Sequence, residues 1–355
     1  MDLQKYCREY RIKYIGNAGG HRLEVNKRST IEQPIEIGQL FSLSFLNCPS
    51  HYLKLVRPSS CEELDIKVND FNESDCYELL QTNSLSKFSI SHNISSDCLN
   101  FLPTDLKGLR LGSLETSDIN EDLKRFISLE RLQINIGENA NFDSSELDFI
   151  KDSLNITDLV CQYFKDANFV KYLSKLSQLK GLTLRFDGPC NYFNCIPAEN
   201  LSHLIYGGTG INDNELSQLP VLYNLNQLYI GGHPQGLKAL DYLREKIPNV
   251  ELLSLEACND DSFFDVASTF QNLTFLGIKS LNIEGDGIAK LAACPNLVKL
   301  NLSGSGLIGK YSEQIGELKN LKELSLNDSL LKARDFKKLK EALPNTRFSV
   351  STRRK

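Results

Sequence analysis

One short apolar pattern recurs along almost the whole chain. The pattern apolar-x-x-apolar-x-apolar occurs thirteen times, and successive copies begin 21 to 27 residues apart. All 39 template positions are apolar, although only 41% of the 355 residues are hydrophobic, so chance does not produce this ladder. The copies begin at Leu40, Cys61, Leu85, Leu106, Leu129, Ile156, Leu179, Leu201, Leu225, Val250, Leu273, Leu297 and Leu321.

A fixed period of this length indicates stacked copies of one structural unit. Since one unit cannot bury its apolar side chains alone, neighbouring units are expected to stack their short strands into one parallel sheet. The segments between strands, such as residues 211–219 and 284–294, carry apolar residues at helical spacing. We therefore predict an α/β solenoid with short helices or 3-10 turns opposite the sheet.

The pattern resembles the leucine-rich repeat, L-x-x-L-x-L-x-x-N/C-x-L, from Leu40 to about Leu343. The resemblance implies a leucine-rich-repeat horseshoe with a parallel concave β-sheet and short helices or 3-10 turns on the convex side. The ninth position caps the turn in that family, and seven repeats fit it, through Cys48, Asn69, Asn93, Thr209, Cys258, Ser305 and Ser329. The other repeats depart from the pattern, so the middle of the arc is expected to be less regular.

The ends of an open stack need caps, because the last apolar layer is otherwise exposed to water. We expect residues 1–39 to form an N-terminal cap, residues 40–343 the thirteen repeats, and residues 344–355 a C-terminal cap strand and a basic tail. About 39 residues are too few for a separate catalytic domain.

The charge distribution weighs against a nucleic-acid partner. The formal net charge is −5 at pH 7, and the segment between two basic ends, residues 1–35 and 332–355, carries −15. Phosphate neutralisation needs a basic face or stripe, which this distribution does not predict.

The sequence also gives an expectation about location. No run of about 18 apolar residues occurs, so no membrane contact is expected. The first residues carry charges throughout and lack the apolar stretch of a secretory signal. Ten scattered cysteines without a Cys-x-x-Cys pair are typical of a reducing compartment. We expect a cytoplasmic protein, or one delivered into a host cytosol without a classical signal peptide.

No sequence signature of catalysis is present. The five histidines lie in different repeats without ligand spacing, and the chain lacks a nucleophile elbow, a zinc-protease motif and a Walker-type loop. Cys190 and Cys195 share one loop, but a nucleophilic role needs a base that the sequence does not locate. We therefore predict that the protein is not an enzyme and that it holds no metal or cofactor.

Strand side chains alternate, so the residues between the buried template positions are expected to face the concave side. The middle of this face is apolar and aromatic, with two arginines beside it, and such a patch is typical of a protein interface. The candidate binding residues are Arg131, Val160, Tyr163, Arg185, Phe186, Ile205, Tyr229, Leu252 and Phe275. The alternative is that local twist buries some of them, above all Tyr163 and Phe186.

Two glycine pairs, Gly207–Gly208 and Gly231–Gly232, stand at the same places in adjacent repeats. They fit either a bare strip that a partner's backbone approaches or simple turn geometry.

The predicted function is non-catalytic binding of a folded protein partner on the concave face, by a chain that is a monomer when unbound. Tyr229, Phe186 and Phe275 are the expected anchors. The resemblance extends to the leucine-rich-repeat effectors that intracellular bacteria deliver into host cells. The alternative is an acidic horseshoe that inhibits a basic enzyme by occluding its active site. Salt separates the two, because a charge-steered inhibitor loses association rate as salt rises.

Overall fold

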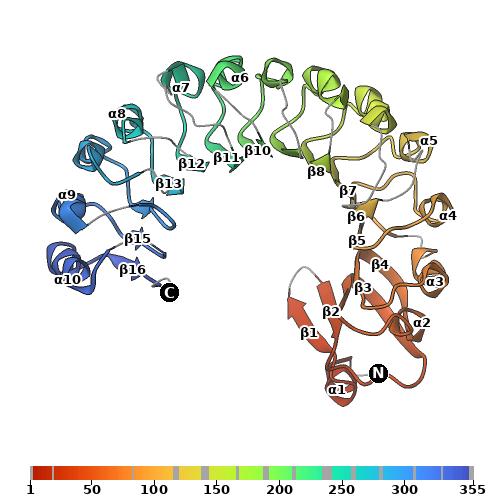
Figure 1. Ribbon diagram of the computed structural model, residues 1–355. Helices are drawn as coiled ribbons and strands as arrows, with labels where there is room; N and C mark the ends of the chain where they lie inside the picture. The colour runs from red at the N-terminus through yellow and green to blue at the C-terminus, as the bar shows by residue number, and fades with distance from the viewer. Residues whose placement is uncertain are drawn as a thin grey trace. The chain divides into compact units, whose positions relative to one another are not determined.

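The computed structural model describes residues 3–17, 20–81, 84–114, 120–136, 144–164, 168–186, 192–209, 213–233, 242–256, 261–279, 283–306, 309–328 and 331–351. The chain divides into two compact units, which we call unit 1 (Met1–Phe164) and unit 2 (Lys165–Lys355). Both units are built from the same alternation of a strand and a short return segment (Figure 1).

Unit 1 contains eight strands among its described residues. They are β1 (Lys13–Asn17), β2 (Gly20–Asn26), β3 (Ile35–Leu46), β4 (Val56–Lys67), β5 (Lys87–Ile90), β6 (Gly108–Leu114), β7 (Arg131–Ile136) and β8 (Asp158–Phe164). Its helices and 3-10 turns are α1 (Leu3–Glu9), α2 (Tyr52–Leu55), η1 (Glu73–Asp75), α3 (Tyr77–Leu80), α4 (Ser96–Asn100), α5 (Asn120–Lys124) and η2 (Ser144–Asp152).

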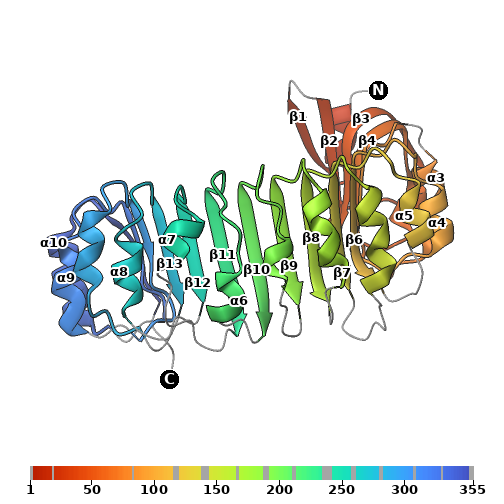
Figure 2. The ribbon, with the colours of Figure 1, turned by 90° about the horizontal axis from the view of Figure 1, so that it is seen from above.

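The described part of unit 2 likewise contains eight strands. Figure 2 shows the first five of them, β9 to β13, side by side. They are β9 (Gly181–Phe186), β10 (His203–Thr209), β11 (Gln227–His233), β12 (Leu252–Glu256), β13 (Phe275–Lys279), β14 (Lys299–Asn301), β15 (Glu323–Ser325) and β16 (Arg347–Ser349). The return segments hold η3 (Asn168–Lys175), η4 (Phe193–Cys195), α6 (Asp213–Ser217), α7 (Leu243–Lys246), α8 (Phe263–Ala267), η6 (Ile288–Ala293), η7 (Gly309–Tyr311), α9 (Ser312–Gly316) and α10 (Ala333–Ala342).

The repeat template forms the core of both units. All 39 template side chains are at most 3% exposed. The middle template residues lie opposite one another on successive strands, as Leu204 and Leu228 do on β10 and β11. Each strand therefore adds a layer of apolar side chains to a continuous core, and the predicted α/β solenoid is confirmed.

The first strands of unit 1 differ from the repeats. β1 pairs with β2 in antiparallel fashion, with Tyr14 opposite Leu23, whereas β2 pairs with β3 in parallel. The antiparallel pair thus lies within residues 1–39, the predicted N-terminal cap, and the pairing from β2 to β3 is already parallel. β3 and β4 are also long, with twelve residues each.

An asparagine stands before the first template residue in several repeats and ties each repeat to the one before it. In unit 1, Nδ2 of Asn155 donates to the carbonyl oxygen of Ile127 at 3.0 Å. In unit 2 the same bond, at 2.6 to 3.3 Å, joins Asn200, Asn224, Asn249, Asn296 and Asn320 to the carbonyls of Ser177, Glu199, Tyr223, Gln271 and Pro295. These bonds satisfy turn carbonyls that have no strand partner.

Each unit has a strand face and a helix face. In unit 2, Figure 1 shows the strands along the inner side of its curve and the helices along the outer side. The inner surface, which we call the strand face, carries the side chains that alternate with the buried template residues. Among the described residues, no helix is long and apolar enough to span a membrane.

Candidate functional site

The parallel register of unit 2 aligns its outward side chains into three rows across the strands. The first row runs Gly181, His203, Gln227, Leu252, Phe275, Lys299, Glu323 and Arg347. The second runs Thr183, Ile205, Tyr229, Ser254, Gly277, Asn301, Ser325 and Ser349. The third comprises Arg185, Gly207, Gly231, Glu256 and Lys279. Neighbours within a row come from adjacent strands, so they can act together on one ligand.

A shallow depression of about 450 Å³ lies over β10 to β13, and we call it the apolar groove. Its walls are Ile205, Tyr229, Leu252 and Phe275, all of which are partly exposed. The template residues Leu204 and Leu228 form the floor, and polar side chains stand around it, namely His203, Gln227, Ser254, Lys299 and Glu323. The groove can therefore bury an apolar side chain of a partner while polar groups at its rim stay hydrated.

Two aromatic rings of the groove lie flat along their own strands. A Cβ placed on Gly231 would lie 2.5 Å from Cε1 of Tyr229, and one placed on Gly277 would lie 3.2 Å from Cε1 of Phe275. Both glycines follow their aromatic residue by two positions, on the same side of the strand. The missing side chains make room for the rings, which leaves the groove open above them.

Tyr229 is also fixed through its hydroxyl group. The hydroxyl donates a hydrogen bond to the carboxylate of Glu256, whose Oε1 lies 3.5 Å from Nζ of Lys279. Burial and the negative charge of Glu256 raise the pKa of Tyr229 to about 12, while Arg185 acts in the opposite direction. The hydroxyl end of the ring thus lies over the bare Gly231 and is bonded to Glu256.

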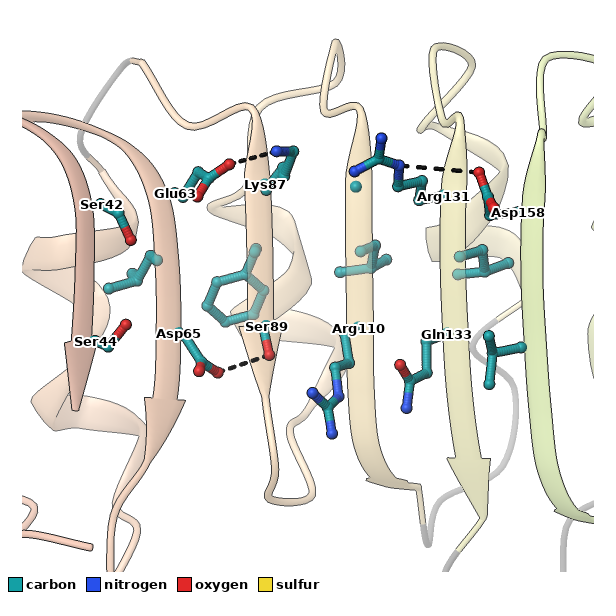
Figure 3. Close-up of a pocket in the computed structure, with 16 residues that line it drawn as sticks. Ser42, Ser44, Glu63, Asp65, Lys87, Ser89, Arg110, Arg131, Gln133 and Asp158 are labelled. Atoms are coloured by element: carbon teal, nitrogen blue, oxygen red, sulfur yellow. Dashed lines mark hydrogen bonds and ion pairs between the residues drawn. The ribbon is translucent and has the colours of Figure 1, made fainter. Parts of the chain in front are cut away.

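Unit 1 carries a second depression of about 660 Å³, which we call the polar groove (Figure 3). Its outward side chains are Ser42, Ser44, Glu63, Asp65, Lys87, Ser89, Arg110, Arg131, Gln133, Asp158 and Val160. Three contacts link neighbouring strands there: the ion pair of Lys87 with Glu63, the 2.7 Å hydrogen bond from Ser89 to Asp65, and the 3.9 Å pair of Arg131 with Asp158. Its charges are thus largely matched within the groove.

The predicted binding residues divide between the two units. In unit 1, Arg131 and Val160 line the polar groove, and Tyr163 is 47% exposed near the end of β8. In unit 2, four predicted residues form the walls of the apolar groove: Ile205, Tyr229, Leu252 and Phe275. Arg185 is exposed in the third row.

Phe186 corrects the sequence-based assignment. Its side chain is only 5% exposed, and its ring centroid lies 6.0 Å from that of Tyr206, which also packs on Phe193. Phe186 is the last residue of β9 and faces inward by strand alternation, as Leu182 and Leu184 do, so it belongs to the core and does not anchor a partner. The alternative expected both Phe186 and Tyr163 to be buried, and only Phe186 is.

From the sequence, Gly231 was noted only as part of a bare strip or a turn, and neither Gly277 nor the charged rim of the groove was recognised. The aromatic-x-Gly spacing of Tyr229 with Gly231, and of Phe275 with Gly277, is the signal that could have located the flat rings. The exposed apolar residues Ile127, Leu154 and Tyr223 lie outside both grooves and were not singled out either.

Two features bear on metal and thiol chemistry among the described residues, the grouping of possible metal ligands and the state of the thiols. No three His, Cys, Asp or Glu side chains gather there as metal ligands. Burial raises the pKa of Cys195, so its thiol is not activated, and Cys190 lies outside the described residues. Burial likewise raises the pKa values of Cys48, Cys61 and Cys294 to about 11.

Comparison with known proteins identifies the fold. No family model and no curated protein sequence matches the chain. A solved leucine-rich-repeat protein of Leptospira interrogans is similar at a TM-score of 0.50 and 16% identity, over 89% of each chain. The internalin InlF of Listeria monocytogenes is similar at a TM-score of 0.52 and 17% identity, over 90% of this chain and 88% of its own.

A third structure, the complex of TLR13 with ssRNA13, is similar at a TM-score of 0.53 and 18% identity. The match covers 93% of this chain but only 48% of the TLR13 chain. At such identities the three likenesses establish architecture and carry no information about partners. Together with the buried template and the strand register, they show that the chain has the leucine-rich-repeat fold, with short helices and 3-10 turns opposite its strands.

Proposed function

We propose that the protein is a non-catalytic interaction module and that a folded protein partner docks on the apolar groove of unit 2. One observation carries this proposal. Four large apolar side chains, Ile205, Tyr229, Leu252 and Phe275, stand side by side on the strand face and remain partly exposed. Burial of apolar surface by a partner stabilises the complex by roughly 25 cal/mol for each Å² removed from water, so these side chains favour binding of a partner.

The form of the groove favours a protein over a small metabolite. The groove is an open depression across four strands, and a small-molecule site is usually a cleft that encloses most of its ligand. Rigid aromatic walls surrounded by polar groups are typical of the central anchors of a protein interface. Leucine-rich-repeat proteins commonly serve as binding scaffolds, which agrees with this assignment.

We propose a protein that is monomeric when unbound and that acts in the cytoplasm, or as a bacterial effector in the cytosol of a host cell. The effector role rests on the resemblance of the irregular repeats to such effectors, and not on any residue of the groove.

The alternative of an acidic inhibitor gains no support from the strand face of unit 2. The three rows there carry four basic side chains, Arg185, Lys279, Lys299 and Arg347, and two acidic ones, Glu256 and Glu323. This surface is basic although the whole chain has a net charge of −5. A face of this charge does not attract the basic rim of an enzyme.

Affinity capture with matched variants tests the proposal. The full chain, a Tyr229→Ala/Phe275→Ala variant and a Tyr223→Ala control are immobilised and exposed to bacterial and host-cell cytosol, and the captured proteins are identified by mass spectrometry. Tyr223 is 66% exposed and lies outside the groove, so its loss removes aromatic surface without changing the proposed site.

The proposal expects a protein that the wild type and the control retain and that the double variant loses. Thermal unfolding of each chain verifies that the double variant is folded. Equal capture by all three folded chains would show that the groove is not the interface.

A further inference from the structure

We propose that the segment of the partner that enters the apolar groove is acidic and places an Asp or Glu carboxylate on Arg185, beside the apolar side chain that fills the groove. This inference rests on the proposed function and adds the chemical character of the partner. It follows from how the charges of the strand face of unit 2 are already paired.

Each carboxylate of the three rows is shared between two donors of the same chain. Glu256 accepts the hydrogen bond of the Tyr229 hydroxyl and lies 3.5 Å from Nζ of Lys279. Glu323 lies 3.4 Å from Nζ of Lys299 and 2.9 Å from the Nη2 atom of Arg347. Neither carboxylate is therefore available as the main counter-ion of a basic partner.

Arg185 is different, because it has no carboxylate within ion-pair distance among the described residues, and it is exposed. Its guanidinium group can offer a two-pronged set of N–H donors to a carboxylate from outside. The strand face thus presents a net positive charge together with one arginine that has no carboxylate partner in the described part of the chain. Charge complementarity then favours a negatively charged ligand.

The position of Arg185 joins this charge to the groove. Arg185 lies opposite Gly207 on β10, and Gly207 lies opposite Gly231 on β11. A Cβ on Gly207 would lie 3.4 Å from Cγ of Arg185, so the aliphatic part of the arginine runs beside the bare glycine. The hydroxyl end of Tyr229 lies over Gly231, one strand further along the same row. The arginine on β9 and the aromatic wall on β11 are therefore separated only by the bare Gly207 of β10.

A single-stranded RNA is the competing ligand, since bases could stack on Tyr229 and Phe275. RNA binding, however, depends on several cations that neutralise successive phosphates. Three of the four basic side chains in the rows are already paired with Glu256 or Glu323, and within the described residues Arg185 is the one left without a carboxylate. The pairing therefore favours a peptide segment with one carboxylate over a polyanion.

Selection from a phage-displayed library of random peptides tests the inference on the full-length protein. We expect the wild type to enrich peptides in which a large apolar residue stands within a few positions of Asp or Glu. A fluorescent copy of the best peptide is then titrated by polarisation against wild type, Arg185→Glu, Tyr229→Ala and the control Arg244→Glu. Arg244 is an exposed arginine of α7 on the helix face, so its reversal makes the same charge change away from the groove.

Reversal of Arg185 is expected to weaken the peptide about tenfold, because an attraction becomes a repulsion, while the Arg244 variant binds like wild type. A peptide whose acidic residue is replaced by Lys should regain affinity for Arg185→Glu and not for wild type. These two results together support the inference.

Several outcomes would overturn it in distinguishable ways. If the enriched peptides lack acidic residues, the acidic partner is refuted although the groove stays a site. The same holds if a peptide binds wild type and Arg185→Glu equally well but binds Tyr229→Ala more weakly. Tighter binding of a labelled oligouridylate than of any peptide would assign the face to RNA. Selected peptides that bind Tyr229→Ala as well as wild type would contradict the proposed function itself.

Discussion

Replacement of Gly231 by alanine tests the packing that shapes the apolar groove. The new Cβ would lie 2.5 Å from Cε1 and 2.8 Å from the hydroxyl oxygen of Tyr229. Favourable carbon–carbon contacts lie at about 3.5–4.0 Å, so the ring must move by about 1 Å or more. Since it is the end of a rotatable side chain, it can leave without shifting the backbone. We therefore expect Gly231→Ala to displace the ring of Tyr229 and to disrupt its hydrogen bond to Glu256.

The change in stability is expected to be small, because two effects oppose each other. Loss of the partly exposed hydrogen bond to Glu256 costs about 1 kcal/mol. Gly→Ala restricts the unfolded chain, and this restriction stabilises the fold by about 0.4–1 kcal/mol where the backbone conformation suits alanine. The free energy of unfolding should therefore change by less than about 1 kcal/mol, while partner binding falls with the loss of one groove wall.

The assay follows the ring itself. The pKa of Tyr229 is raised to about 12 in the folded protein, so the neutral phenol favours the fold. That contribution is fully present below about pH 10 and is lost as the pH rises to about 12. In Gly231→Ala the pKa should move back towards about 10, so the variant should lose less stability than wild type across this range.

Carbon-13 NMR of labelled tyrosine rings measures the pKa of Tyr229, and Tyr229→Phe assigns its signal. The control is Gly38→Ala, because a Cβ on Gly38 meets no atom within 4 Å. A Tyr229 resonance that titrates near pH 12 in both Gly231→Ala and wild type would refute the account of how the ring is held.

Three further predictions concern the repeats. Phe186→Ala should lower the free energy of unfolding by about 3 kcal/mol or more, because it opens a cavity in the core. Tyr163→Ala, at the equivalent position of the previous repeat, should change the free energy of unfolding by about 0.5 kcal/mol. Urea denaturation of both variants measures the difference. Asn249→Ala should lower the free energy of unfolding by about 1 kcal/mol in the same assay, because the hydrogen bond to Tyr223 of the preceding repeat is lost. An unchanged denaturation midpoint would show that these asparagine bonds do not stabilise the fold. Among the described cysteines, Cys195 should react first with a thiol reagent at pH 7, and mass-spectrometric mapping that finds buried Cys161 labelled earlier would contradict its burial.

The core was predictable from sequence because its cause is local and periodic. Side chains alternate along a strand, and stacked repeats bury the same three positions in every copy. Residues such as Leu204, Leu228 and Leu253 therefore fall where the template places them, opposite one another on adjacent strands. The antiparallel pairing of β1 with β2 was not predictable in this way, since those strands precede the repeat.

The eighth repeat position shows where sequence reasoning stops. Tyr163 and Phe186 occupy the same position in consecutive repeats, yet one is exposed and the other is buried. The difference lies in the backbone: Phe186 continues the alternation of β9, whereas Tyr163 has a left-handed φ of 67° and the next residue, Phe164, is buried in its place. The repeat template does not contain the left-handed backbone at Tyr163, so the template alone does not separate the two positions.

The candidate site was predictable as a set of outward positions but not as a charged surface. The outward position of its four wall residues, such as Ile205 and Tyr229, follows from strand alternation alone. Net charge summed along the chain suggested an acidic face, whereas the register brings Arg185, Lys279, Lys299 and Arg347 to the strand face of unit 2. Charge on a surface depends on which residues the fold brings together, and composition does not contain that information.

Site-specific photocrosslinking tests most directly whether the apolar groove binds a partner. A benzoylphenylalanine is placed at Gln227, on the rim of the groove, or at Arg244, on the outer helix α7, and each chain is illuminated in cytosol that contains the captured partner. The account predicts a crosslink to the partner from position 227 and none from position 244. A crosslink from position 244 alone would place the interface on the helix face and contradict the central claim.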